Sequence, residues 1–194
     1  KGKGLPQYQA LTQNSADAWN EFAAQVKDVS GIGFQLEKKG GLVFCLGDDE
    51  FAARKKHLSD LQKTSPFDPD WEMLGRNETQ HRVGDIALGS EVVGASFCHR
   101  DGAVNPLDLV RSLTKAIERL GGRIVRETPV HSVQKKTGGW SVATLERTVE
   151  CGEVVVAAGL GSKKIASDMG IDLPIEADKG QILVTERRPK AMLL

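Results

Sequence analysis

The chain has 194 residues, of which 40% are hydrophobic and 27% are charged. This composition supplies a proper core, so it excludes an intrinsically disordered chain and a small scaffold held together by disulfides. The 26 basic and 26 acidic residues cancel, whereas a nucleic-acid-binding domain normally carries a basic excess that displaces counterions from phosphates. We therefore expect no nucleic-acid partner.

Cysteine usage and hydropathy indicate a cytoplasmic setting. Cys45, Cys98 and Cys151 lie far apart without a C-x-x-C pair, which is typical of reduced thiols rather than a disulfide framework or a zinc site. The four histidines show no metal-ligand spacing, so we expect no metal. No apolar run approaches the roughly 20 residues that a membrane span needs, and no signal-peptide core follows Lys1.

Hydrophobic periodicity predicts alternating helices and short strands in the first half of the chain. The predicted elements are a helix over 15–26, a hairpin of runs 34–37 and 42–46, a helix from Asp48, a weak helix over 71–81 and a strand over 91–98. Asn14 or Ser15 suits the first N-cap. Lys38 begins the polar and glycine segment that separates the hairpin runs. Acidic side chains at Asp48 and Asp49 complement the dipole of the second helix.

The clearest predicted element is a helix that begins after Asn105. Asn105 is a good N-cap, and Pro106 suits the first helical position because its missing N–H would be unpaired there. Val110 opens a series of apolar residues at helical spacing, and Gly121 with Gly122 ends the helix.

The rest of the chain predicts further short elements. These are apolar runs centred on 124–125, 130–133 and 140–145 (the last two joined by a turn at 137–139), a strand over 154–158, a helix over 162–169 and a strand over 181–185. The run 154–158 is continuous rather than alternating, which predicts burial on both faces in a parallel sheet covered by helices. The fold class is therefore α/β, or mixed α+β with at least one parallel element.

The segment from Val154 to Ser162 is the best candidate for a binding site. A strand, a tight glycine turn and a helix start together allow the backbone to approach phosphate or ribose oxygens closely. Gly159-x-Gly161 is only part of the G-x-G-x-x-G fingerprint, because Lys164 occupies the third position. Most strand–turn–helix units are plain architecture, so both interpretations stay open. No G-x-S-x-G elbow or Walker loop is present.

Three segments together resemble the FAD-dependent oxidoreductases of the D-amino-acid-oxidase and glycine-oxidase type. Residues 101–109 (DGAVNPLDL) resemble the family's D-G-x-v-x-P-x-x-L. Residues 154–162 (VVVAAGLGS) resemble its V-V-x-A-A-G-x-w-s, and residues 179–186 (KGQILVTE) resemble its r-G-Q-i-l-x-T. Their order and separations also fit. Within the family the chain looks similar to the central portion of D-amino-acid dehydrogenases, hydrogen cyanide synthases and opine oxidase subunits.

The resemblance implies two interleaved domains. Residues 1–30 and 103–170 would belong to a Rossmann-like FAD-binding domain, and residues 31–102 and 171–194 to a mixed-sheet substrate-binding domain. The family opens with a strand, G-x-G-x-x-G and an acidic ribose ligand, and this sequence contains none of them. It also lacks the family's C-terminal half, which carries an arginine for the substrate carboxylate. We therefore expect the middle of a longer protein.

The resemblance also implies a cofactor, a substrate class and three cofactor-binding residues. The cofactor is FAD, with Val130 beside its adenine end and Ala158 and Gly159 against its ribose or pyrophosphate. The substrate is a small-molecule amino acid or amine, and the enzyme is a homo- or hetero-oligomer. Gly161 stands where the family usually has Trp, and Asp178 with Lys179 replaces the commoner basic pair. These two departures leave the subfamily open.

Two hypotheses for function follow. In the first, the chain is part of a flavoenzyme that oxidises the C–N bond of an amino acid or secondary amine to an imine by hydride transfer to flavin. No side chain in this segment need act as a base, so no catalytic residue is named. In the second, it is a non-catalytic truncated or accessory module that keeps the fold without binding flavin. We expect the isolated chain to be inactive and to bind FAD weakly or not at all, because it lacks the principal helix N-terminus for the pyrophosphate.

Overall fold

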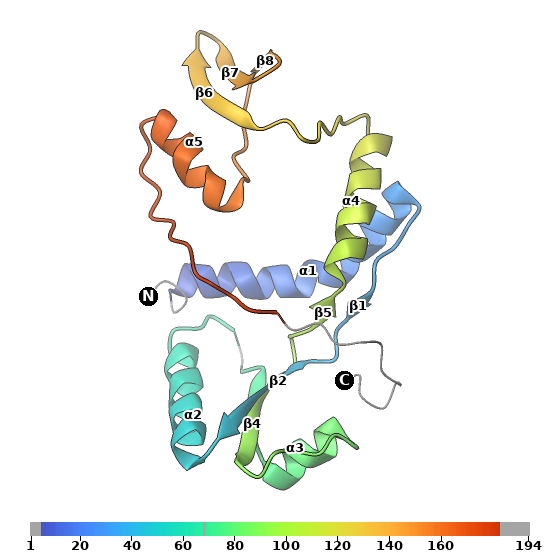
Figure 1. The fold of residues 1–194 in the computed structure, drawn as a ribbon. Coiled ribbons are helices and arrows are strands. Elements are labelled where there is room, and N and C mark those ends of the chain that lie inside the picture. Colours follow the sequence, from blue (N-terminus) through green and yellow to red (C-terminus); the bar gives the residue numbers. More distant parts are fainter. Residues whose placement is uncertain (1–4, 68, 183–194) are drawn as a thin grey trace. The chain divides into compact units, whose positions relative to one another are not determined.

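The computed structural model describes residues 5–67 and 69–182, which fall into two compact units, one up to Arg123 and one from Ile124 onward (Figure 1). The first unit contains α1 (Pro6–Ser30), β1 (Leu36–Glu37), β2 (Gly41–Leu46), α2 (Asp48–Gln62), β3 (Trp71–Gly75), α3 (Arg76–Val83), β4 (Val92–Cys98), β5 (Ala103–Val104) and α4 (Pro106–Arg119). The second unit contains β6 (Val130–Lys136), β7 (Gly139–Thr144), β8 (Thr148–Cys151), the 3-10 turn η1 (Gly159–Gly161) and α5 (Ser162–Asp168). The fold is mixed α/β, as predicted.

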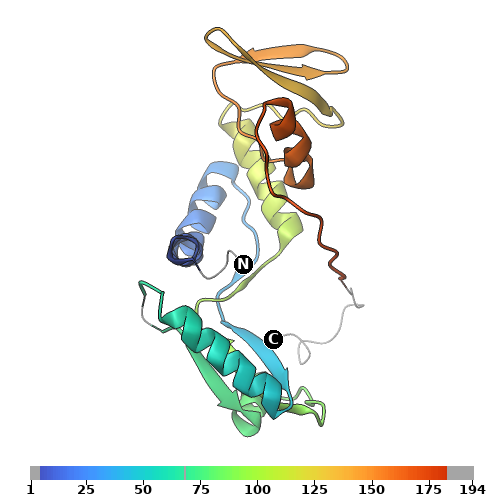
Figure 2. The same ribbon diagram turned by 90° about the vertical axis from the view of Figure 1, so that its left-hand side faces the viewer.

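The core of the first unit is an antiparallel sheet of order β2-β4-β3. The central strand pairs on both sides, so Ala95 lies between Phe44 and Leu74 and is fully buried. Helix α2 lies across one face of the sheet (Figure 2), where Arg54 Nε donates to Ser96 Oγ at 2.9 Å. Neighbouring side chains on a strand point to opposite faces. Phe97 therefore points to the other face, toward α3.

Helices α1 and α4 pack together beside this sheet (Figure 1). Val26 on α1 and Ala116 on α4 are buried, and Ser112 Oγ donates to the carbonyl of Gly33 at 3.2 Å. Helix α4 begins as predicted, because Asn105 Oδ1 accepts hydrogen bonds from the first turn. Its outer side stays apolar and exposed: Leu107 and Leu120 are each 75% exposed.

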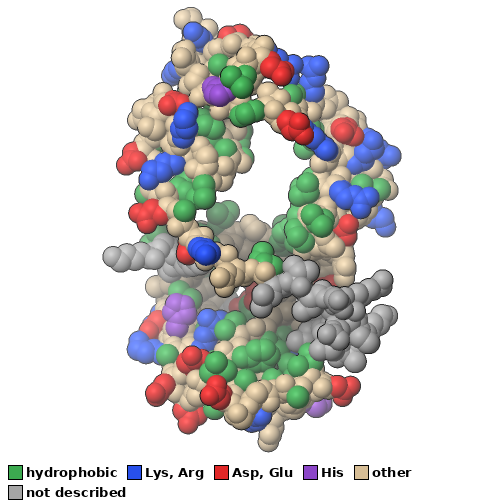
Figure 3. All heavy atoms as spheres, in the orientation of Figure 1, with side chains coloured by type: hydrophobic (Ala, Val, Ile, Leu, Met, Phe, Trp, Pro, Cys, Tyr) green, Lys and Arg blue, Asp and Glu red, His purple; other side chains and the backbone are tan. Residues whose placement is uncertain are grey.

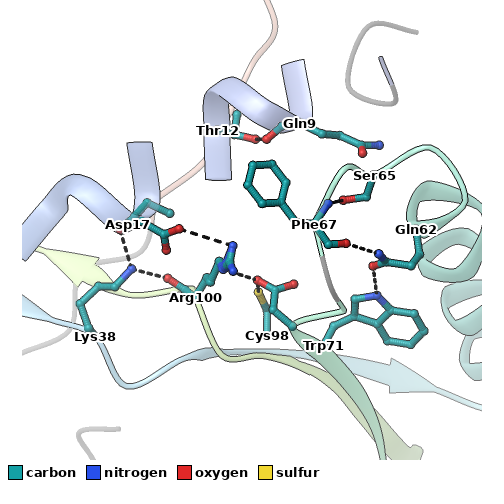
Figure 4. Close-up of polar contacts among 12 residues, drawn as sticks. Gln9, Thr12, Asp17, Lys38, Gln62, Ser65, Phe67, Trp71, Cys98 and Arg100 are labelled. Carbon is teal, nitrogen blue, oxygen red and sulfur yellow. Dashed lines mark hydrogen bonds and ion pairs between the residues drawn. The ribbon is translucent and has the colours of Figure 1, made fainter. Parts of the chain in front are cut away.

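A polar cluster ties α1 to the loops that flank the sheet (Figure 4). Lys38 Nζ donates to the carbonyls of Ala16, at 2.9 Å, and of Arg100, at 2.5 Å. The Arg100 guanidinium pairs with Asp17 at 3.6 Å and with Asp70 at 3.3 Å. Because these contacts join residues far apart in the sequence, they fix where α1 lies within the first unit.

The second unit is an antiparallel meander, β6-β7-β8, with α5 packed against β6. Val133 on β6 is 2% exposed and anchors this small core. The predicted turn at 137–139 joins β6 to β7, and the predicted helix from Ser162 is α5. The strand from Val92 and the helix from Asp48 are likewise confirmed in the first unit.

Several local predictions are wrong because long-range pairing overrides the local pattern. Residues 34–37 and 42–46 do not form a hairpin: β1 pairs with β5, and β2 pairs with β4. Residues 71–75 are a strand on β4 rather than the start of a helix. Helix α1 begins at Pro6, well before Ser15, because Pro at the first position starts the helix there.

The predicted buried strand over 154–158 is also wrong. These residues have no strand assignment, and Val155 is 89% exposed. All three sheets among the described residues are antiparallel, so no parallel partner is present there to pair with the segment. The run 124–125 forms no strand either. Of the predicted strand 181–185, Gln181 and Ile182 have no strand assignment, and 183–185 lie outside the described residues.

Candidate functional site

An apolar cavity of about 380 Å³ lies within the second unit. Its nine lining residues are all Val, Ala or Ile and come from β6, β7, the segment after β8 and α5. Val130 and Val133 form one wall, Val142 continues it, and Ala158 and Ile165 lie on the side of α5. A cavity lined in this way favours a flat apolar group over a charged one.

The glycine turn beside this cavity is held in shape by its own hydrogen bonds. The Ala158 N–H donates to Ser162 Oγ at 3.0 Å, and the Gly161 N–H donates to the Ala158 carbonyl at 3.0 Å. Gly159 has a left-handed φ of 56°, and a Cβ there would meet nothing within 4 Å. Its backbone is therefore open to close approach by a ligand.

The structure brings two of the three predicted cofactor-binding residues together. Val130 and Ala158 line the same cavity although they belong to β6 and to the turn before α5. Gly159 is adjacent in sequence but is not among the lining residues. The contact of all three with FAD stays a prediction.

These residues fit the adenosine end of FAD. The apolar cavity suits an aromatic ring, and the open backbone at Gly159 suits a ribose or phosphate oxygen. Lys163 and Lys164 supply positive charge in the first turn of α5. Helix α5 has only seven residues, so its dipole adds little.

A second cavity, of about 300 Å³, lies on the sheet of the first unit, on the face opposite α2. It is lined by Glu37, Lys39, Gly40, Leu42, Phe44, Arg82, Phe97 and Ala103. Figure 3 shows hydrophobic side chains gathered in the lower part of the view, where β2 lies. Sequence reasoning missed this cavity because its walls come from β1, β2, α3, β4 and β5, and no motif spans them.

Charged side chains form the rim of the second cavity. Lys39 Nζ lies 3.0 Å from the Glu37 carboxylate, and hydrogen bonds from Lys39 and Gln35 hold the pKa of Glu37 below its ordinary value. Arg82 Nη2 donates to Glu72 Oε1 at 3.0 Å. Its guanidinium carbon also lies 3.9 Å from the centre of the Phe97 ring, a cation–π contact.

Two thiols of the first unit do not suit nucleophilic chemistry. Burial raises the pKa of the Cys45 thiol and of the Cys98 thiol above the ordinary value. A raised pKa leaves less thiolate, which is the reactive form. Within residues 5–67 and 69–182, no group of three or more His, Cys, Asp or Glu is placed to hold a metal ion.

Comparison with known proteins decides the family. The profile of the family described as "FAD dependent oxidoreductase" matches residues 2–194. The chain belongs to this family of FAD-dependent oxidoreductases. FAD is the cofactor of the family, which agrees with the predicted cofactor. Among the described residues, no helix is long and apolar enough to cross a membrane.

Individual relatives support the same assignment. An opine oxidase subunit from Agrobacterium tumefaciens (strain Ach5) is 35% identical over 195 residues, covering 99% of this chain and 52% of that protein. Glycine oxidase from Bacillus licheniformis is 25% identical over 169 residues, covering 87% of this chain and 43% of that protein. The crystal structure of glycine oxidase from Geobacillus kaustophilus matches with a TM-score of 0.73 at 21% identity, covering 87% of this chain and 44% of that one. The chain thus spans about half the length of the relatives that it matches.

Proposed function

We propose that the chain is part of a flavoenzyme that oxidises the C–N bond of an amino acid or secondary amine to an imine. The observation that carries this proposal is the apolar cavity of the second unit. Val130 and Ala158 both line it, and the backbone of Gly159 beside it is open to a ligand. Membership of the FAD-dependent oxidoreductase family supplies the chemical class.

The cofactor-binding part of the proposal assigns one role to each residue. Val130 and Ala158 hold the adenosine end of FAD, and Gly159 lets the ribose or pyrophosphate approach the backbone. When bound, FAD supplies the acceptor for the hydride that leaves the substrate carbon. On this proposal residues 1–30 and 103–170 belong to the FAD-binding domain.

The substrate-binding part assigns residues 31–102 and 171–194 to a second domain. The substrate binds at the β2-β4-β3 sheet, on the face that α2 leaves uncovered. Leu42, Phe44 and Phe97 provide an apolar floor that excludes water from the substrate. The substrate loses a hydride from carbon and a proton from nitrogen, and water then hydrolyses the imine to a carbonyl compound and an amine.

The test uses the full-length protein that contains these residues. We expect a yellow preparation whose flavin absorbance is bleached by amino acids or secondary amines in the absence of oxygen. Val130→Asp places a charge in the apolar cavity, so we expect roughly a tenfold loss of FAD affinity. Arg111→Gln, on the exposed side of α4, is the matched control. A colourless wild-type protein that takes up no added FAD would contradict the proposal.

A second candidate function is a non-catalytic module that keeps the fold without flavin. It is favoured by one observation: no charged side chain lines the cavity of the second unit, so nothing within that lining neutralises a pyrophosphate. The same FAD titration of the full-length protein decides between the two candidates, because the module takes up no flavin.

Assembly and location are proposals of the same kind. Two relatives are named as subunits of an opine oxidase, which supports a homo- or hetero-oligomer here. We also propose a cytoplasmic location, which is supported by the sparse and unpaired cysteines of the chain. Size-exclusion chromatography with light scattering, on the full-length protein, measures the assembly state.

A further inference from the structure

We infer that Arg82 selects substrates that carry an acidic arm, and that Glu72 competes with that arm for the same guanidinium. This inference rests on the proposed amine oxidation and deepens it by naming a substrate class. It concerns only the cavity on the first unit's sheet, whose walls all belong to that unit.

Arg82 is the cation in excess at this cavity. Three charged side chains line it, and two of them, Lys39 and Glu37, pair with each other at 3.0 Å. The net charge of the lining is therefore carried by Arg82. Its own partner, Glu72, lies outside the lining. A lining with a net positive charge over an apolar floor favours a ligand with an apolar body and one anionic end, which would compete with Glu72 for Arg82.

The guanidinium of Arg82 is held in place, and some of its N–H donors remain available to a ligand. The guanidinium carbon lies 3.9 Å from the centre of the Phe97 ring, and this cation–π contact holds the guanidinium over the ring. Arginine has five N–H donors. Among the described residues only Glu72 accepts a hydrogen bond from this side chain, through Nη2 at 3.0 Å. The side chain is 41% exposed, so a ligand can reach it.

The floor under Arg82 is built for this contact. Phe97 is 4% exposed and packs on Gly40, where an added Cβ would overlap the ring. Gly40 has a φ of 86°, a conformation that glycine adopts without strain. The backbone thus makes room for the ring, and the ring in turn positions the guanidinium.

Glu72 gives the inference a test that a purely structural role of Arg82 cannot mimic. Its carboxylate also lies 3.5 Å from His99 Nε2, so Glu72 is shared between two partners. If Arg82 binds an anionic arm, removing the Glu72 charge frees the guanidinium and strengthens binding of that arm. If Arg82 is only structural, losing either partner of the ion pair has the same effect.

The experiment compares two unreactive substrate mimics on the flavin-loaded full-length protein. Thiodiacetate carries two carboxylates on a thioether, and (methylthio)acetate carries one. Isothermal titration calorimetry gives the ratio of their dissociation constants. We expect wild type to prefer thiodiacetate about tenfold, as one charge-assisted hydrogen-bonding contact implies. We expect Arg82→Gln to abolish this preference and Glu72→Gln to increase it.

Controls separate charge from folding. Arg82→Lys keeps the charge and should retain part of the preference, and Arg111→Gln removes an exposed arginine of α4 and should leave the ratio unchanged. Where Arg82→Gln does not fold, Glu72→Gln and Arg82→Lys decide the matter. A wild-type ratio near one, an unchanged ratio in Arg82→Gln, or a reduced ratio in Glu72→Gln overturns the inference.

Turnover distinguishes failure of the inference from failure of the proposed function. Iminodiacetate and N-methylglycine are the corresponding amines with two and one carboxylates. If wild type oxidises both and Arg82→Gln keeps the wild-type selectivity, the inference fails and the amine oxidation stands. If the preference among the thioethers holds but no amine bleaches the flavin, the proposed oxidation fails and Arg82 is only an anion-binding residue.

Discussion

Two apolar segments of this chain differ in burial and in strand formation although their compositions are similar. Strand β4 is buried along most of its length and pairs with a neighbour on each side. Residues 154–158 are equally apolar, yet they form no strand and Val155 is 89% exposed. The difference lies in the partners: β4 pairs with β2 on one side and β3 on the other, whereas residues 154–158 pair with no strand among the described residues.

This comparison shows what a continuous apolar run encodes. It encodes a need for burial on both faces, and the chain meets that need only where it also provides neighbouring strands and covering helices. In the first unit α2 and α3 cover the sheet. Without such partners Val155, Ala157 and Ala158 stay exposed, and Val154 and Val156 are only half-buried.

The largest expected effect comes from placing a charge in each segment. Ala95→Asp in β4 buries a carboxylate without a partner, so we expect a loss of about 4 kcal/mol in the free energy of unfolding. Val155→Asp in the 194-residue chain should change it by less than about 0.5 kcal/mol, because the side chain faces solvent. Urea unfolding followed by circular dichroism measures both. Equal losses in the two variants would show that residues 154–158 are buried in solution.

Local signals account for what could be predicted from the sequence. Helix α4 was predictable because Asn105, Pro106 and Gly121 mark its ends within one short stretch. The pairing of β1 with β5 was not, because it joins Leu36 to Val104 and no turn connects them. Residues 71–75 have a weak helical pattern, but pairing with β4 makes them a strand.

The candidate sites also differ in whether a local sequence signal points to them. The family resemblance singled out Val130 and Ala158, and both line one cavity, while their contact with FAD stays a prediction. Arg82 could not be predicted, because an arginine in a short helix carries no signal until Phe97 is folded beneath it. Sequence patterns identify turns and helix ends, whereas a cavity built from five elements exists only in the folded chain.

Glycine substitutions test the same difference between a packed region of the first unit and an open region of the second. Gly40→Ala drives a Cβ into the Phe97 ring at a φ of 86°, so strain and overpacking should together cost about 3 kcal/mol. Gly159→Ala also has a positive φ, but its Cβ meets nothing within 4 Å, so strain alone should cost about 1 kcal/mol. Chemical denaturation of the two variants measures the difference. Equal costs would mean that Phe97 moves away freely, which would weaken the assignment of a rigid floor beneath Arg82.

Helix starts give a smaller difference. Asn105 Oδ1 accepts from the N–H groups of Leu107, at 3.1 Å, and Asp108, at 3.3 Å, so Asn105→Ala should cost about 1 kcal/mol. Ser162→Ala removes one hydrogen bond to Ala158, whose N–H lies on an exposed residue and can bond to water instead. We therefore expect about half that cost. Thermal unfolding of both variants and of Asn105→Ser, which keeps a capping side chain, checks the order.

The smallest effect is a titration on the surface of the first unit. Lys56 and Lys63 both hydrogen-bond to the Asp60 carboxylate, at 2.6 and 2.7 Å, and lower its pKa to about 2. Because the pKa is lowered in the folded chain, these pairs are complete above pH 4 or so and are lost as the pH falls toward 2.

Carboxyl-carbon NMR should show this midpoint in wild type and an ordinary value, about 4, in the double variant Lys56→Met, Lys63→Met. Since Asp60 is at the surface, solvent screens its ion pairs, and the change belongs in the titration curve rather than in the unfolding curve. A wild-type Asp60 midpoint near 4 would show that the two pairs do not persist in solution.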